Sequence, residues 1–341
     1  YGLNKEKNHY NVSEYNGKDA NVRIPSMYNG LYVTYIASSA FLDCKDLVSI
    51  IIPNSVTNIG DCAFGGCTSL TNVYYNGTIE DWCNISFSSS SSNPMCYASH
   101  FYMLNENNEY KEVTEIVIPE TVTKIGDYKF YGFGNITNIT IPNSVISIGK
   151  SAFGGCTSLT SMTLPFIGNG GSETHFGYIF GATYKSVNYG YVPTTRKEVT
   201  ITGYKSIGNF AFGGCTSLTN IIISGEVTKI DFDAFFGCTS LKSISIPNSV
   251  KSIGQRAFSS CKSLTNMVIP NSVTSIEDLA FSECTSLMTI FIPNSVKSLG
   301  NSVFYNCDNL TINCEASVKP NEWKELWNYS NCKVVWGYKK N

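Results

Sequence analysis

The sequence is poor in charge. Charged residues make up 15% of its 341 residues, against the usual quarter, and the formal net charge is −2. Serine, threonine, asparagine and tyrosine replace the missing charged residues, so hydroxyl and amide groups are the main surface groups that interact with water. Because basic residues are not in excess, no electrostatic field favours nucleic acid or an anionic membrane as a partner.

Long apolar runs and metal-binding motifs are also missing. No run approaches the roughly 18 apolar residues that a membrane span needs, so we expect no membrane insertion of this segment. The sequence contains no Cys-x-x-Cys, and its three histidines form no His-x-x-x-His pair. We therefore predict no metal and no cofactor. His175 and Glu173 lie near each other, but no nucleophile or oxyanion hole accompanies them. The sequence thus predicts no catalytic residues and no enzyme.

A repeat dominates the sequence. Ala-Phe-x-x-Cys recurs, with variants Val-Phe at Phe304 and Lys-Phe at Phe130. Within each uninterrupted stretch the step is 23 residues, inside the range of roughly 20–29 for leucine-rich repeats. The phenylalanines stand at positions 41, 64, 130, 153, 212, 235, 258, 281 and 304.

One unit, 235–257, shows how a repeat should fold. Alternation places Leu241, Ile244 and Ile246 inside a strand, while the serines between them face outward. Pro247 should end the strand, and a second apolar step reaches Ile253. Stacked coils about 4.8 Å apart should then align equivalent residues into Phe, Cys, Leu and Ile ladders. We also expect a positive φ at the glycines that end this step, which are Gly60, Gly126, Gly149, Gly208, Gly254 and Gly300.

Eight of the thirteen cysteines occupy the repeat position, and Phe133 replaces the cysteine in the remaining repeat. We interpret them as buried thiols, because stacked side chains are too far apart for a disulfide. A Cys314–Cys332 bridge stays open as an alternative.

The repeats resemble the BspA-like, or treponemal-type, leucine-rich repeats. The matching text is Ile-Pro-Asn-Ser-Val-x-x-Ile/Leu-Gly at 52–60, 141–149, 246–254 and 292–300, followed by Ala-Phe-x-x-Cys-x-Ser-Leu. The resemblance implies an extracellular or cell-surface protein whose role is adhesion to host proteins or to other cells. It carries over no catalytic residue.

The predicted fold is a repeat solenoid. We expect a right-handed leucine-rich-repeat coil of about nine 23-residue repeats, built from short parallel strands, turns and short helical or 3-10 segments, and curved with a concave β face. A capping segment should cover 1–39, the array 40–310, and a second cap 311–341. Capped ends predict a monomer.

Two insertions interrupt the array. The first, about 76–113, reads as a degenerate coil with one protruding turn, and 102–113 resembles a hairpin. The second, 165–198, is rich in glycine and aromatic residues. We interpret it as a lid whose aromatics pack back onto the solenoid, with direct ligand contact as the alternative.

Outward strand positions should line the concave face, where Ile51, Tyr74, Ile222, Val268 and Phe291 form an apolar row. The alternative is that such residues merely favour strands. From the second insertion we add Phe176, Tyr178 and Tyr189 as ligand-contact candidates.

The leading hypothesis is a non-enzymatic recognition or adhesion module that binds a host or bacterial surface protein or glycan. A structural spacer or stalk of a larger surface protein is the alternative. An enzyme with its site in 165–198 is a remote one, because no catalytic constellation is present.

Overall fold

The computed structural model describes residues 1–341 except 172–173, 185–187, 189, 196 and 340–341. Over the described residues the chain forms a parallel β-solenoid of about 14 turns. The predicted fold class is confirmed, but the predicted count of nine repeats was too low. Coils without the Ala-Phe-x-x-Cys motif also stack. The chain divides into two compact units, Tyr1–Leu159 with Ile179–Gly181, and Thr160–Tyr178 with Ala182–Asn341.

The coils of the first unit contribute longer strands to two successive sheets and, in most coils, a two-residue strand to a separate ladder. The longer strands are β3 (Asn21–Arg23), β6 (Ser49–Pro53), β8 (Asn72–Asn76), β10 (His100–Leu104), β12 (Glu115–Val117) and β14 (Asn138–Thr140). The opposite ladders contain β5 (Leu31–Ile36), β7 (Asn58–Ile59), β9 (Ser86–Phe87), β13 (Lys124–Ile125) and β15 (Ser147–Ile148). Further elements are β1 (Gly2–Leu3), β2 (Tyr10–Val12), β4 (Met27–Tyr28), β11 (Tyr110–Glu112), α1 (Ile79–Asn84), η1 (Ser90–Ser92) and η2 (Pro94–Cys96).

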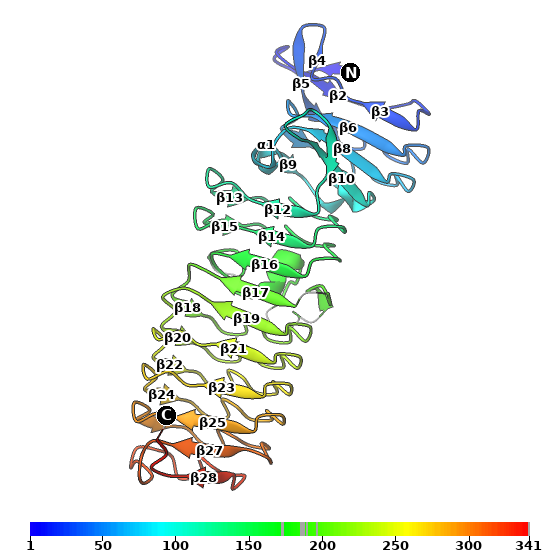
Figure 1. The fold of residues 1–341 in the computed structure, drawn as a ribbon. Helices are drawn as coiled ribbons and strands as arrows, with labels where there is room; N and C mark the ends of the chain where they lie inside the picture. The colour runs from blue at the N-terminus through cyan, green and yellow to red at the C-terminus, as the bar shows by residue number, and fades with distance from the viewer. Residues whose placement is uncertain (172–173, 185–187, 189, 196, 340–341) are drawn as a thin grey trace. The chain divides into compact units, whose positions relative to one another are not determined.

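The second unit repeats this design, and its longer strands follow one another as successive rungs in Figure 1. They are β16 (Ser161–Leu164), β17 (Glu198–Ile201), β19 (Asn220–Ile223), β21 (Ser243–Ser245), β23 (Asn266–Val268), β25 (Thr289–Ile292), β27 (Thr311–Cys314) and β28 (Lys333–Val335). The short ladder holds β18 (Ser206–Ile207), β20 (Lys229–Ile230), β22 (Ser252–Ile253), β24 (Ser275–Ile276) and β26 (Ser298–Leu299). One 3-10 segment, η3 (Phe176–Phe180), precedes β17.

The repeat unit 235–257 folds as the alternation predicts. Ile244 lies inside β21 at 7% exposure, and its neighbours Ser243 and Ser245 are exposed. In the parallel register Asn220 pairs with Ser243, so equivalent positions of adjacent coils lie side by side. The second apolar step forms β22, which pairs in parallel with the next coil.

The predicted phenylalanine ladder is confirmed. In the second unit Phe235, Phe258 and Phe281 are fully buried, and adjacent ring centroids are 5.1 and 5.3 Å apart at interplanar angles of 9° and 2°. The first unit has the same stacking between Phe41 and Phe64, at 5.2 Å and 5°. The N–H of each of these phenylalanines except Phe64 donates to the carbonyl directly before the next stacked phenylalanine, for example Phe258 to Ala280 at 2.8 Å.

A left-handed residue lies two positions before and two positions after each ladder phenylalanine. Around Phe235, Asp233 has φ 53° and Gly237 has φ 68°. Around Phe258, Arg256 and Ser260 have φ 54° and 60°, although neither is glycine. A non-glycine residue in this region costs roughly 1–2 kcal/mol, so the packed ring and the backbone hydrogen bonds beside it must hold the turn in place.

The glycines that end the second apolar step were misinterpreted from the sequence. Gly254 is not among the residues with positive φ in the described chain, and neither are its equivalents. A Cβ at Gly254 would instead lie 2.7 Å from the backbone carbon of Asp231 in the preceding coil, and one at Gly149 would lie 2.4 Å from the nitrogen of Asp127. These positions require glycine because the adjacent coil passes too close for a side chain.

The first interruption forms a coil of its own. Strand β10 pairs in parallel with β8, with His100 opposite Asn72, and β9 extends the short ladder from β7. The expected hairpin is confirmed, because β10 also pairs antiparallel with β11, with Tyr102 opposite Glu112. The same coil contains the short helix α1, which begins with a capping box between Thr78 and Asp81.

The second interruption lies inside one long coil. Strand β16 still pairs in parallel with β17, with Ser161 opposite Glu198. Phe166, Phe176 and Phe180 are all buried, at 6%, 0% and 4% exposure. The phenylalanine rings of the extra segment therefore lie in the core, which agrees with the interpretation of a segment that packs back onto the solenoid, whereas Tyr184 and Tyr191 are exposed at 71% and 47%.

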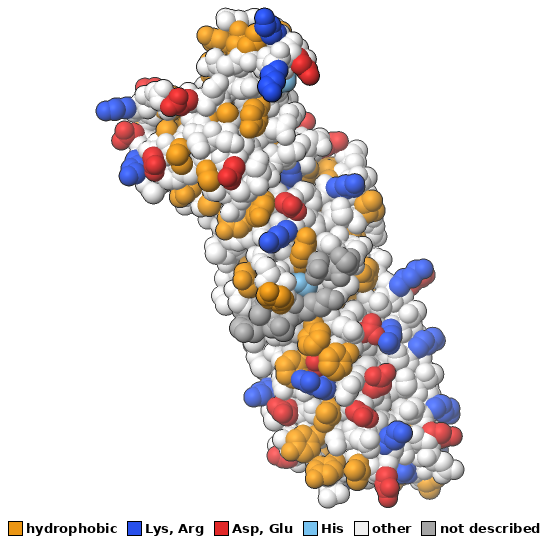
Figure 2. Space-filling model, turned by 180° about the vertical axis from the view of Figure 1, so that it is seen from behind, with side chains coloured by type: hydrophobic (Ala, Val, Ile, Leu, Met, Phe, Trp, Pro, Cys, Tyr) orange, Lys and Arg blue, Asp and Glu red, His pale blue; other side chains and the backbone are white. Residues whose placement is uncertain are grey.

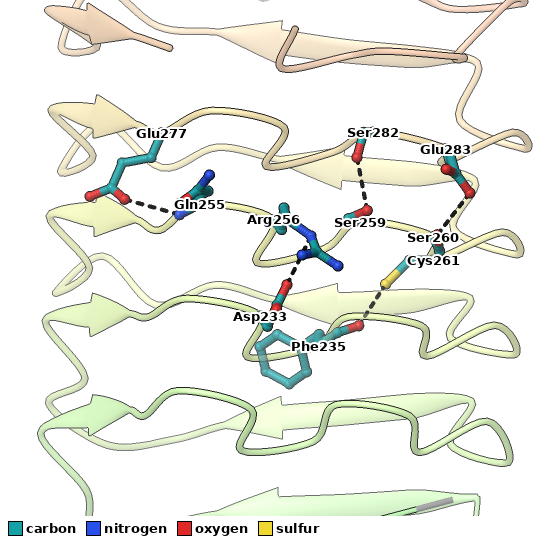
Figure 3. Close-up of polar contacts among 10 residues, drawn as sticks. All are labelled: Asp233, Phe235, Gln255, Arg256, Ser259, Ser260, Cys261, Glu277, Ser282 and Glu283. Atoms are coloured by element: carbon teal, nitrogen blue, oxygen red, sulfur yellow. Dashed lines mark hydrogen bonds and ion pairs between the residues drawn. The ribbon is translucent and has the colours of Figure 1, made fainter. Parts of the chain in front are cut away.

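A thiol ladder runs beside the phenylalanines. In Figure 3 the Cys261 thiol donates to the carbonyl of Phe235 at 3.2 Å, and five other repeat cysteines make the same bond. The same view shows hydroxyl contacts between coils, such as Ser282 to Ser259 at 2.8 Å. Cys314 and Cys332 are both buried thiols that are not bonded to each other, so the structure does not contain the alternative bridge.

Parallel strands continue past residue 311, where β27 and then β28 extend the sheet. Trp323 and Trp327 are buried at 3% and 6% exposure, and with Trp336 they form a cluster with ring centroids 5.0–6.1 Å apart. The Trp323 indole N–H donates to the carbonyl of Val296 at 3.1 Å. The cluster therefore packs against the last repeats.

Candidate functional site

The outward positions of the first unit's longer strands line up in register. Arg23 pairs with Ile51, Ile51 with Tyr74, and Tyr74 with Tyr102. Two of these residues, Ile51 and Tyr74, were predicted from the sequence. The structure places both on this row, which we call the outward row, and both are half-buried.

Three tyrosines gather at one end of the outward row. The rings of Tyr74 and Tyr102 stack with centroids 4.7 Å apart at 19°, and Tyr110 meets Tyr74 edge-on at 4.7 Å. The Tyr110 hydroxyl donates to Asn76. Burial raises the pKa of Tyr102 and Tyr110. These phenols therefore stay protonated at neutral pH and can donate hydrogen bonds. We call Tyr74, Tyr102 and Tyr110 the tyrosine cluster.

A polar group borders the tyrosine cluster. His100 Nδ1 lies 2.7 Å from Glu112 Oε1, and the Asn135 amide donates to the same oxygen at 2.9 Å. The hydrogen bonds from His100 and Asn135 hold the pKa of Glu112 below its ordinary value. The His100 and Glu112 side chains are 41% and 33% exposed, so a ligand on the tyrosines could also reach them.

Four residues of this surface were not predicted from the sequence: Tyr102, Tyr110, His100 and Glu112. The first interruption shifts them off the 23-residue count, so no repeat position identified them. A signal was present in His-Phe-Tyr-Met-Leu at 100–104, where Phe101 is the buried residue between two outward ones. Aligning Phe101 with Val73 would have placed Tyr102 beside Tyr74.

The remaining outward candidates lie in the second unit. Ile222 and Val268 are 36% and 58% exposed, whereas Phe291 is half-buried with its ring 6.1 Å from that of Tyr338. They do not form an unbroken apolar stripe. Strand β21 ends one sheet and β23 begins the next, and a hollow of about 750 Å³ lies over both strands. Ser245 pairs with Ile222 within this hollow.

The ligand-contact candidates from the second interruption differ in burial. Phe176 is fully buried, its N–H donates to Ala211 at 2.7 Å, and its ring lies 5.1 Å from Phe212. It thus takes the ladder position before Phe212, and its assignment as a ligand contact was wrong. Tyr178 is half-buried with its ring 6.1 Å from that of His175. Tyr189 lies outside the described residues.

His175 has a structural environment. It is fully buried, and its Nδ1 lies 3.2 Å from Asn188 Oδ1. Asn188 in turn donates to the carbonyls of Phe210 and Gly213 and accepts from the Gly177 N–H. His175 therefore acts here as a packing and hydrogen-bonding residue.

The buried repeat thiols are poorly suited to act as nucleophiles or metal ligands, because both roles need a thiolate. Burial raises the pKa of Cys67, Cys238 and Cys307 to about 12, so these thiols stay protonated at neutral pH. Within the described part of the chain no three His, Cys, Asp or Glu side chains gather as a metal site would need. No described helix is both long and apolar enough to cross a membrane. On the face seen in Figure 2, acidic and basic side chains are interspersed.

Comparison with known proteins identifies similar chains. The family model for the BspA type leucine rich repeat region, in six copies, matches residues 20–108, 105–177 and 193–323. A leucine-rich repeat protein from Bacteroides ovatus is 24% identical, with 98% of this chain and 97% of that chain covered and a TM-score of 0.47. A leucine rich cell surface protein from Faecalibacterium prausnitzii is 26% identical, with 99% and 96% covered and a TM-score of 0.36. No curated protein matches the chain.

Proposed function

Because the chain belongs to the BspA-type leucine-rich-repeat family, we propose that it is a non-enzymatic recognition module. It binds a surface protein or a glycan through the outward row of the first unit, with the tyrosine cluster as the main contact. Leucine-rich repeats generally serve protein interaction, so the proposal adds a surface and a set of residues to that general role.

The observation that carries this proposal is the stacked pair of Tyr74 and Tyr102 on an open strand face. Parallel stacking holds each ring by its neighbour, so little side-chain entropy remains to be lost on binding. Tyrosine offers an apolar ring face and a hydroxyl together, which suits contact with a protein side chain or a sugar ring. Tyrosine is also among the residues enriched at the centres of binding interfaces.

The polar side chains that border the tyrosine cluster support specificity. Glu112 is held ionised by His100 and Asn135, and Arg23 lies at the other end of the outward row. An apolar centre with hydrogen-bonding groups around it is the usual arrangement of a recognition surface. A ligand with both an apolar face and hydroxyl or amide groups would satisfy both parts.

We further propose that the protein acts outside the cell or at the cell surface. The family supports this location. Free cysteines are uncommon in oxidising surroundings. The repeat thiols after Cys44 are buried and stay protonated where their pKa is raised to about 12, so they resist oxidation.

The test is binding of the purified chain to an array of host matrix proteins and glycans, beside a Tyr74→Ser/Tyr102→Ser variant. Each lost tyrosine should cost about 1–2 kcal/mol, so the variant should bind at least about tenfold more weakly. Tyr32→Ser is the matched control, because Tyr32 is 59% exposed but lies outside the cluster. Circular dichroism should show all three chains folded.

A third variant separates the two units. Ile222→Ser/Phe291→Ser should bind as the unmodified chain does, because both residues lie in the second unit. Loss of binding in this variant, with binding kept in the tyrosine variant, would move the site to the second unit. No binding to any array member would contradict the proposal and favour a structural spacer.

A further inference from the structure

Lys129 stands where seven other repeats have alanine, directly before the ladder phenylalanine. Its side chain is nevertheless buried, at 2% exposure. Alanine fits this position elsewhere because the preceding coil packs against it. Space for a long side chain at Lys129 means that the preceding coil differs here.

The preceding coil is the first interruption, and it has no ladder phenylalanine to offer. In the regular repeats the carbonyl before the phenylalanine accepts an N–H from the phenylalanine of the previous coil. At Lys129 the carbonyl instead accepts from the indole N–H of Trp82 at 2.9 Å and the amide of Asn93 at 3.2 Å. Side chains thus replace the missing backbone contact, and the coil is displaced from its regular path.

The displacement leaves a cavity of about 440 Å³, lined by Lys129 and Gly126 among others. Gly126 shows how open it is. At Gly149 and Gly254 an added Cβ would collide with the backbone of the preceding coil, whereas at Gly126 it would meet only Lys129, 3.6 Å from Cε and 4.0 Å from Nζ. The volume lies within the roughly 300–1,000 Å³ of small-molecule sites.

The ammonium group beside this opening has no acidic partner. Lys129 Nζ donates to the carbonyl of Ile85 and lies 5.2 Å from the centre of the Phe87 ring. Among the described residues no carboxylate forms an ion pair with it. Buried charges are normally paired, because an uncompensated one is costly. Burial accordingly lowers the pKa of Lys129 to about 8, which still leaves it mostly charged at pH 7.

The other walls of the cavity carry neutral hydrogen-bonding groups. Asn84, Ser86, Thr121 and Thr123 line it, all are exposed, and none of their side chains makes a hydrogen bond within the described chain. Three charged residues also line it, Glu80, Lys124 and Asp127, and all three are exposed. Asp127 accepts the N–H of Lys150 at 2.8 Å, and Glu80 is an exposed residue in the first turn of α1.

From this juxtaposition we infer that the cavity is a second binding site, separate from the outward row, and that it takes an acidic sugar. The carboxylate of a uronic acid would lie against the Lys129 ammonium through the opening at Gly126. Its ring hydroxyls would bond to the amide and hydroxyl groups of the other walls. One sugar residue fits a cavity of this volume.

The test is calorimetric titration of the full chain with D-glucuronate and with D-glucose, which has the same hydroxyls but no carboxylate. We expect glucuronate to bind and glucose to bind at least about tenfold more weakly, because a charge-assisted hydrogen bond is lost. Lys129→Met should weaken glucuronate binding by a similar factor. Gly126→Ala keeps the lysine but narrows the opening, and it should weaken binding too.

The control is Lys124→Met, which removes an exposed lysine of the same wall and should change the affinity less than about twofold. Affinity for glucuronate should also fall about tenfold between pH 7 and pH 9, as Lys129 loses its proton. Cys83, with a pKa of about 12, does not titrate in this window. Absent glucuronate binding, equal binding of both sugars, or unchanged binding in folded Lys129→Met would overturn the inference.

Discussion

Replacing one ring of the phenylalanine ladder should weaken the solenoid locally and strongly. Phe258 is fully buried between Phe235 and Phe281, with ring centroids 5.1 and 5.3 Å away. Phe258→Ala removes the buried ring and leaves a cavity, for which the expected loss is about 3–5 kcal/mol. The rings on both sides are stacked in turn, so the site has little freedom to collapse and the loss should lie in the upper half of that range.

The assay is native-state hydrogen exchange, because coils contact mainly their neighbours and the damage should be local. The N–H of Phe235, which donates to Ala257, and that of Phe258, which donates to Ala280, should lose protection. Amides in β27 should change little. A loss below about 1 kcal/mol would refute the reasoning, because it would mean that the ladder fills space without supporting the coil.

A double-mutant cycle separates ring stacking from volume. Phe258→Leu and Phe281→Leu keep most of the apolar volume but remove the nearly parallel rings. If stacking matters, the two changes should couple by about 0.5–1.5 kcal/mol, the usual worth of an aromatic pair beyond its buried area. If the losses of stability in the two single variants simply add in the double variant, the shape of the side chains alone determines stability here.

The other predictions concern the thiols and a buried carboxylate. With Ellman's reagent at pH 8, the half-buried Cys44, Cys62 and Cys96 should react first and the buried repeat thiols only on unfolding; fast labelling of more thiols would contradict this. Burial raises the pKa of Asp233 against the lowering effect of Arg256, 3.2 Å away, so folding favours its protonated form. This contribution to stability is present at low pH and is lost as pH rises through the folded pKa. Urea unfolding should therefore show that the free energy of unfolding of Asp233→Asn rises relative to that of the unmodified chain between about pH 4 and pH 7. A variant that is less stable by the same margin at every pH would show instead that the ion pair is stabilising.

The repeat made the core predictable. A 23-residue step fixes which residues stack, so Phe235, Cys238 and Ile244 can be placed in the core from the sequence alone. Burial and stacking depend on contacts between equivalent residues of adjacent coils, and the sequence repeats those contacts. The role of Gly254 was missed because its requirement comes from the backbone of the preceding coil, not from its own dihedral angle.

The candidate sites were less predictable because both arise where the repeat fails. Tyr102 joins Tyr74 only because the first interruption still forms a coil in register. Lys129 borders a cavity only because the same coil lacks a ladder phenylalanine. Phe176 was assigned to the surface from its aromatic neighbours, although its N–H bond to Ala211 places it in the core. Long-range register decides each of these cases, and local sequence does not report it.

The register across the long coil between β16 and β17 has an evolutionary consequence. Ser161 still pairs with Glu198, although the intervening segment is much longer than a regular repeat. Lengthening one coil therefore does not disturb the pairing of the strands that flank it. A lineage can add or trim residues in such a segment and leave inherited contacts elsewhere intact, whereas a shift of one residue within a strand would turn its inner side chains outward. In this protein we expect natural variation in length to concentrate between rungs, where new surfaces can arise.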